Sequence, residues 1–160
     1  INRCGVIAGP WQLGKVDQGV FTYWLANHYF KKPLKYIGFG GSGKQVRDLL
    51  HVDDLCDLIG RQIQALPNHR AERFNVGGGL AGSLSLMETT GLCREITGNV
   101  VEISSEATER PFDLPWYVTD NGNTGEVFGW TPQYTPQDIL VSTYEWLKAH
   151  EQAFSKVFNG

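Results

Sequence analysis

Apolar positions recur along the chain in two patterns, short continuous runs and longer stretches with helical spacing. In the stretch 20–30 the spacing is helical and no helix breaker intervenes before Pro33, which predicts a helix. Ser85 and Glu88 have the spacing of a capping box ahead of a second helix that reaches Gly98. A third helix is expected over 53–66, where Asp53 or Asp54 would cap it and these apolar residues share one face: Leu55, Leu58, Ile59, Ile63 and Leu66.

Toward the C-terminus, the pattern predicts a short helix that ends at Gly129 and a final helix over 136–149. Short apolar runs between the helices predict strands, and these cover residues 3–8, 34–39, 74–76 and 100–104, with a further short segment at 117–120. Strands that alternate with helices are typical of layered α/β folds. The sequence therefore predicts the α/β class.

The chain has 160 residues and a net charge of −3, from 14 basic and 17 acidic side chains. This length favours one domain, and the lack of a basic excess argues against a nucleic acid or a membrane surface as a partner. No apolar run approaches the roughly 20 residues that span a bilayer. Cys4, Cys56 and Cys93 lie far apart and outside any Cys-x-x-Cys pair, which favours buried thiols in a reducing compartment, the cytoplasm.

The chain opens at Ile1, and an apolar run follows with no turn or helix cap before it. This pattern predicts a strand that is entered directly from preceding chain. We therefore expect residues 1–160 to form a single α/β unit within a longer protein.

The first glycine-rich stretch, Gly38-x-x-x-x-Gly43-Lys44, matches a phosphate-binding P-loop up to its last position. Gln45 stands where a Ser or Thr hydroxyl should hold Mg²⁺, and the residues that follow do not have the spacing of an amphipathic helix. A glycine-rich turn between two strands is favoured over an ATPase loop.

The second stretch, Gly77-x-Gly79-x-x-Gly82, follows a strand, precedes a helix and so resembles a dinucleotide-binding fingerprint. The preceding strand is short, however, and Ser85 places the helix cap after the third glycine rather than before it. A turn is favoured here as well.

Patterns for nucleophilic or metal-dependent catalysis are missing from the sequence. It contains no Gly-x-Ser-x-Gly and no His-Glu-x-x-His, and its four histidines are scattered. His51-Val-Asp-Asp54 is better explained as a strand that ends in a capping aspartate than as a metal site. We expect no metal centre.

Two arginines in polar loops remain as candidates for ligand binding. Arg47 follows the first glycine turn beside Asp48, and Arg110 lies in a proline-stiffened loop between Glu109 and Asp113. In each case the adjacent acid is expected to orient the guanidinium group. A guanidinium group can hold two phosphate oxygens at once, so two such side chains suit a diphosphate. The alternative is a pair of surface ion pairs of little energetic value, which spacing alone slightly favours.

These residues resemble motifs in the C-terminal half of extended short-chain dehydrogenases/reductases, the NAD-dependent sugar-nucleotide epimerases and dehydratases. The resemblance runs nearly end to end, in family order. Its motifs are Arg3 to Gly9-Pro10-x-Gln12, Gly43-x-Gln45-x-Arg47-Asp48-x-x-His51-Val52-x-Asp54, Phe74-Asn75-Val76-Gly77-Gly78, Arg110-Pro111-x-Asp113 and Phe128-Gly129-Trp130-x-Pro132. It implies the C-terminal part of a Rossmann-like fold with its substrate-binding subdomain.

The resemblance also implies roles for individual residues. Arg47 and Arg110 match arginines that hold the diphosphate of a sugar nucleotide, and Asp113 matches an acid that contacts the ribose. Lys35 and Ile37 match the strand against the base. Further implied contacts are Gln12 and Gln45 for the substrate, and Cys4, Gly5 and Val6 for the nicotinamide end of NAD.

Two family features are not found in the sequence, namely the glycine-rich NAD loop and the proton-moving Tyr-x-x-x-Lys pair. Only Tyr144 and Lys148 have that spacing, and they fall in the last predicted helix, where the family has a surface helix. The resemblance implies transient oxidation of a sugar carbon by NAD in the intact protein, with this part alone inactive. Its partner would be a nucleotide-diphosphate sugar, with a homo-oligomer also conceivable; the alternatives are a nucleotide-binding module without catalysis and a divergent P-loop NTPase.

Overall fold

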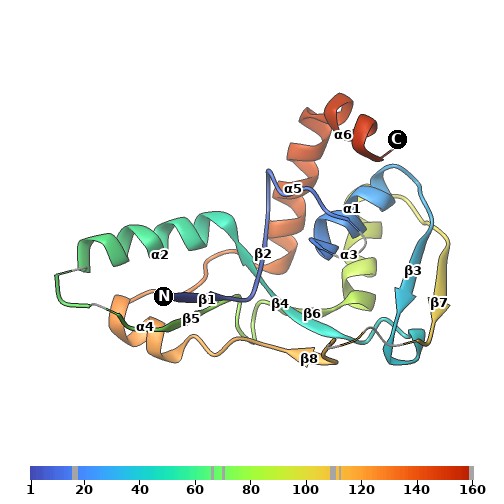
Figure 1. The fold of residues 1–160 in the computed structure, drawn as a ribbon. Coiled ribbons are helices and arrows are strands. Elements are labelled where there is room, and N and C mark those ends of the chain that lie inside the picture. Colours follow the sequence, from blue (N-terminus) through green and yellow to red (C-terminus); the bar gives the residue numbers. More distant parts are fainter. Residues whose placement is uncertain (16–17, 66, 70, 109–110, 112, 159–160) are drawn as a thin grey trace.

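The computed structural model describes residues 1–15, 18–65, 67–69, 71–108, 111 and 113–158, and it is a mixed α/β structure (Figure 1). Its strands are β1 (Asn2–Cys4), β2 (Val6–Ala8), β3 (Leu34–Ile37), β4 (Val46–His51), β5 (Phe74–Val76), β6 (Ser83–Ser85), β7 (Ile103–Glu106) and β8 (Trp116–Tyr117). Its helices are α1 (Val20–Tyr29), the short 3-10 helix η1 (Phe39–Gly41), α2 (Val52–Ala65), α3 (Leu86–Thr97), α4 (Gly122–Phe128), α5 (Pro136–Ala149) and α6 (Glu151–Phe158).

Strand β4 lies at the centre of the fold. Its first half pairs with β6 in the antiparallel sense and with β8 in the parallel sense, and its second half pairs with β2 in parallel. Two further parallel pairs, β1 with β5 and β3 with β7, lie beside this sheet. Figure 1 shows α2, α4 and the β1–β5 pair on one side of β4, and α1, α3 and the β3–β7 pair on the other.

Side-chain alternation along β4 divides the core. Leu49 packs in a cluster built mainly by α1, α3 and α5, whereas Leu50 packs with Leu58 of α2 and with the buried Trp130. A third, smaller cluster joins α1 to α5 and α6. None of the helices in the described ranges is long and apolar enough to cross a membrane.

Several predicted elements are confirmed. Helices α1, α3 and α5 lie where the apolar spacing places them, and the capping box at Ser85 and Glu88 is formed. The stretch around Gly38–Gly43 is a turn that contains η1 and joins β3 to β4, as favoured above. The turn interpretation of the second glycine stretch is also confirmed, because Gly82 is followed by the short strand β6 rather than by a helix.

Other predictions need correction. The opening run is two strands, because the chain steps at Gly5 from the sheet of β5 to that of β4, and the Gly5 N–H donates to the Val76 carbonyl (2.8 Å). The strand expected over 100–104 forms at 103–106, the segment at 117–120 forms its strand at 116–117, and helix α6 is not foreseen. Helix α2 starts at Val52, so neither aspartate is its cap. The expected burial of the cysteines holds for Cys93 but is wrong for Cys4 and Cys56, which are exposed.

Candidate functional site

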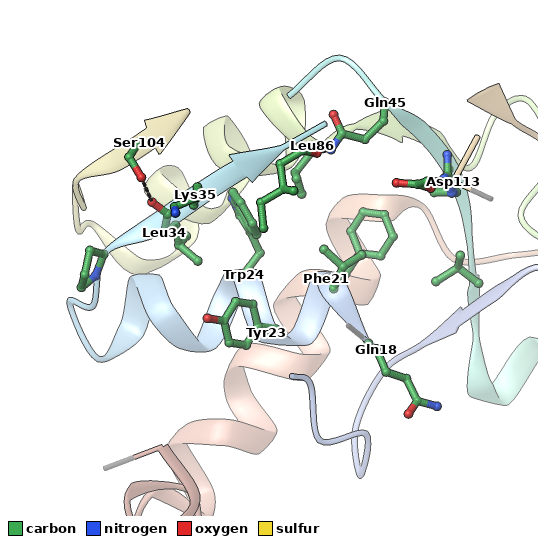
Figure 2. Close-up of a pocket in the computed structure, with 16 residues that line it drawn as sticks. Gln18, Phe21, Tyr23, Trp24, Leu34, Lys35, Gln45, Leu86, Ser104 and Asp113 are labelled. Atoms are coloured by element: carbon green, nitrogen blue, oxygen red, sulfur yellow. Dashed lines mark hydrogen bonds and ion pairs between the residues drawn. The ribbon is translucent and has the colours of Figure 1, made fainter. Parts of the chain in front are cut away.

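A cavity of about 620 Å³ opens between α1, β3 and the first half of β4. The residues that line it include six singled out from the sequence, which are Val6, Lys35, Ile37, Gln45, Arg47 and Asp113. In Figure 2, Lys35 and Ser104 lie toward one end of the cavity, and Gln45 and Asp113 lie toward the other. The fold therefore brings together most of the predicted substrate contacts.

Arg47 and Asp113 form an ion pair at one end of this cavity. The Arg47 Nη2 lies 2.6 Å from Oδ1 of Asp113, and Nη1 donates to the Val46 carbonyl at 2.7 Å. The side chains keep 20% and 28% of their surface exposed, so the pair remains open to a ligand. Since guanidinium hydrogens outnumber these two contacts, Arg47 can donate to a phosphate as well.

The sequence interpretation gave Asp48 the role of orienting Arg47, and the structure corrects it. Side chains alternate across β4, so Arg47 faces the cavity while the neighbouring Asp48 is buried elsewhere. Asp113, 66 positions further along the chain, takes that role instead. The other predicted arginine, Arg110, lies outside the described residues.

The middle of the cavity is apolar. Val20 and Trp24 of α1 face Leu34 and Ile37 of β3, with Leu86 at the start of α3. The Trp24 ring is held in place, because its Nε1 donates to Thr90 Oγ1 (2.9 Å) and its face stacks on the Tyr36 ring at 5.5 Å between centroids. A slot with rigid apolar walls suits a flat, weakly polar group such as a nucleobase.

Polar groups sit at both ends of this slot. Lys35 Nζ pairs with Glu106 Oε2 at 3.0 Å on the rim. The Gln45 Nε2 donates to the Ile37 carbonyl at 3.4 Å, while Gln45 Oε1 is buried and has no hydrogen-bond partner within the described ranges. That oxygen is an acceptor suited to an N–H or O–H donor of a ligand.

Three of the predicted contacts do not line the cavity. Gln12 instead braces the loop after β2, because its Nε2 donates to the Ile7 carbonyl (2.7 Å) and its Oε1 accepts from Thr22 Oγ1 (3.1 Å). Cys4 and Gly5 lie in and beside β1, and only Val6 of the predicted cofactor segment reaches the cavity.

Three N–H groups of the second glycine stretch already have acceptors within the chain. Gly77 donates to Asn121 Oδ1 (2.9 Å), Gly79 to Asp48 Oδ2 (3.0 Å) and Gly82 to the Gly78 carbonyl (3.2 Å). These three N–H groups are therefore not free to bind a pyrophosphate.

Tyr144 and Lys148 do not form a catalytic pair at this site. Both lie on α5, where Lys148 Nζ sits 5.1 Å from the centre of the Tyr144 ring and pairs with Glu145. The Tyr144 ring packs edge-on against Tyr29. Neither residue lines the cavity, and their contacts are those expected of a structural pair.

Sequence reasoning missed Trp24 and Ser104 as lining residues and Asp48 as a buried anchor. Trp24 and Ser104 occur in segments predicted correctly or nearly so as a helix and a strand, but nothing in their local pattern indicates a ligand. Their role follows only from the pairing of β3 with β7 and from the packing of α1 beneath them.

Comparison with known proteins gives one family. Residues 1–77 match the model of the NAD dependent epimerase/dehydratase family. CDP-paratose 2-epimerase of Salmonella typhi is 30% identical over 106 residues, which are 66% of this chain and 31% of that protein. The matched part of the chain thus spans less than a third of the length of this curated relative.

Solved structures show the same architecture. Pal from Bacillus thuringiensis superposes with a TM-score of 0.76 and 25% identity over 92% of this chain and 45% of that one. UDP-glucuronic acid 4-epimerase from Bacillus cereus, in a complex with UDP-glucuronic acid and NAD, gives a TM-score of 0.79 at 20% identity, over 92% of this chain and 44% of that one. The second likeness is one of fold alone.

Proposed function

Since the chain belongs to the NAD dependent epimerase/dehydratase family, we propose that it is the nucleotide-sugar-binding half of a sugar-nucleotide epimerase. Its substrate is a CDP-sugar or another nucleotide-diphosphate sugar. The observation that carries the proposal is the Arg47–Asp113 pair at the end of an apolar cavity of about 620 Å³.

The order of groups along the cavity fits the order of groups in a sugar nucleotide. The base lies in the apolar part of the cavity, which Trp24 and β3 both border, with Lys35 and Ile37 as its predicted contacts. The diphosphate lies on Arg47, with Arg110 as its second predicted contact. Asp113, beside Arg47, is placed to accept from a ribose hydroxyl.

This half works by holding the nucleotide so that the sugar reaches the reacting groups. Fixing the substrate in one orientation is itself a large part of catalysis, because it removes the entropic cost of the encounter. The reaction of the intact protein is transient oxidation and re-reduction of a sugar carbon, with NAD supplying the hydride transfer.

Of the two alternatives, the P-loop NTPase receives no support, because Gly38–Gly43 leads into strand β4 rather than into a helix. A nucleotide-binding module without catalysis would use the same cavity. An activity assay of the full-length protein with nucleotide sugars separates that module from an epimerase.

The first prediction tests the site itself. In the 160-residue chain, Arg47→Ala should weaken binding of uridine or cytidine 5′-diphosphate by roughly 1.5–3 kcal/mol, the range for hydrogen bonds to charged groups. The affinity of Arg47→Lys should fall between those of the original chain and Arg47→Ala, because an ammonium group keeps the charge attraction but not the two-pronged geometry. Calorimetric titration measures the affinities.

Arg61→Ala is the matched control. Arg61 is an exposed arginine on α2 that pairs with Asp57 at 2.9 Å and does not line the cavity, so its loss should leave nucleotide affinity unchanged. If Arg47 and Arg110 hold one diphosphate, Arg110→Ala should also weaken binding, and the two losses should not add. Unchanged affinity in both single variants would refute the proposed function.

A further inference from the structure

We propose that Asp48 is a positioning residue of the nucleotide site, a buried carboxylate that fixes the strand carrying Arg47 against the segment carrying Asp113. The inference rests on the proposed function. Asp48 faces away from the cavity and does not line it, so it would act through these two neighbours rather than on the ligand.

The contacts of Asp48 join three parts of the chain. Its side chain is fully buried, and Oδ2 accepts from the Gly79 N–H at 3.0 Å and from the Thr119 N–H at 3.2 Å. Gly79 belongs to the turn after β5, and Thr119 lies two residues beyond β8. One carboxylate oxygen therefore ties both segments to β4, directly behind Arg47.

The Thr119 contact completes a line of attachments between the 113–119 segment and β4. The Val46 N–H donates to the Pro115 carbonyl at 2.9 Å, and β8 aligns Tyr117 with Arg47. Asp113 Oδ1 also accepts from the Leu114 N–H at 2.9 Å, which orients its carboxylate. With Thr119 held at the far end, the register that sets Asp113 opposite Arg47 is fixed at both ends.

Close packing leaves Asp48 little freedom to move. A Cβ on Gly77 would lie 2.3 Å from Asp48 Oδ2 and from Thr119 Oγ1, so only glycine fits there. A Cβ on Gly5 would lie 2.9 Å from Thr119 Oγ1 and 3.3 Å from Asp48 Oδ1. Gly5 adjoins Val6, which reaches the cavity. Asp48 and Thr119 therefore also pack against the segment that is predicted to face the cofactor.

Asp54 is a matched control for the burial of an aspartate. It keeps 3% of its surface exposed, and its carboxylate accepts from the Gln133 and Tyr134 N–H groups at 2.9 and 3.2 Å. It fixes the segment before α5, and neither it nor its partners line the cavity. Removing Asp54 should cost similar stability without touching the nucleotide site.

The experiment measures the affinity for uridine 5′-diphosphate and the melting temperature of each variant of the 160-residue chain. We expect Asp48→Ala to raise the Kd about tenfold and Asp48→Asn to keep it within about twofold, because an amide oxygen accepts the same N–H groups. Asp54→Ala should lower the melting temperature with an unchanged Kd. In an Arg47→Ala background, Asp48→Ala should raise the Kd further by less than about twofold, because the two residues act on one contact with the ligand.

The role of Asp48 would be overturned if the Kd of Asp48→Ala were no higher than that of Asp54→Ala. It would also be overturned if the losses of affinity from Asp48→Ala and Arg47→Ala added fully in the double variant. If Asp48→Ala does not fold, Asp48→Ser, whose oxygen is one atom short of the N–H groups, takes its place in the same comparison. The proposed function fails separately, by unchanged nucleotide affinity in both the Arg47→Ala and the Arg110→Ala variants.

Discussion

Consecutive residues of β4 serve different parts of the molecule because their side chains point alternately to opposite faces. Arg47 faces the cavity, and Asp48 on the opposite face accepts hydrogen bonds from the loops after β5 and β8. Leu49 and Leu50 pack in separate cores. At the end of the strand, the buried His51 stacks on the Tyr134 ring at 4.0 Å between centroids. A shift of one residue in the register of this strand would therefore remove the site and both cores together.

A buried histidine makes stability sensitive to acid. His28 is fully buried, and its Nδ1 donates to the Trp24 carbonyl at 2.9 Å, while Nε2 has no partner within the described part of the chain. Burial lowers the pKa of His28 below the ordinary 6.5, with a smaller contribution from the charge of Arg94. The unfolded chain thus binds the proton first as the pH falls.

The folded state should lose stability as the pH falls from 6.5 toward the lowered pKa of His28. His28→Gln should flatten this part of the profile, since glutamine does not titrate. Thermal unfolding between pH 8 and pH 5 measures the effect. His69→Gln, at a half-buried histidine beside Glu72, is the control, and an equal flattening there would contradict the assignment to His28.

At the scale of elements, local pattern predicted those helices that carry both an apolar stripe and an end signal. Helix α3 begins at its capping box and ends at Gly98 in the left-handed conformation, and α5 begins at the box of Thr135 and Asp138. Helix α6 was missed because Phe154 is the only buried side chain among those described in it, and one apolar position does not define a helical spacing.

The contacts between the residues of the site were less predictable from the sequence than the identities of those residues. The sequence motifs around Arg47 and Asp113 identified both residues through family resemblance. Their pairing with each other, however, depends on the register of β8 against β4. Through the same long-range pairing, Asp113 takes the place of Asp48 as the acid that orients Arg47. Local spacing carries no information on contacts between residues 66 positions apart.

The capping box of α3 yields a prediction at this scale. The Glu88 N–H donates to Ser85 Oγ (3.1 Å), and Glu88 Oε2 accepts from the Ser85 N–H and Oγ–H, each at 2.7 Å. Ser85→Ala should cost about 1 kcal/mol in the free energy of unfolding, as for other N-caps. Because these bonds lower the pKa of Glu88, its contribution is present above the ordinary 4.5 and is lost as the pH falls through the lowered value.

Urea unfolding at pH 7 and at pH 3 measures this contribution. The difference in stability between the original chain and Ser85→Ala should shrink at the lower pH. A difference that is the same at both pH values would show that Glu88 takes no part in the cap.

At the scale of the whole molecule, the two larger cores meet only across the thickness of the central sheet. One is built around α1, α3 and α5, and the other around α2 and Trp130. Trp130 is tied to the β4–α2 junction, because its Nε1 donates to the Asp54 carbonyl at 3.1 Å. Adjacent residues of β4 belong to different cores, so displacement of the strand disturbs the packing of both.

This sharing predicts that residues 1–160 unfold as one unit. Leu50→Ala removes a fully buried side chain from the core of α2 and should cost about 2–5 kcal/mol. If unfolding is cooperative, the slowest amides of α3, on the other side of β4, should exchange hydrogen faster by about the same factor as those of α2, roughly 30-fold or more. Hydrogen exchange followed by mass spectrometry measures both helices in one sample. Faster exchange confined to α2 would mean that the two sides of β4 unfold separately.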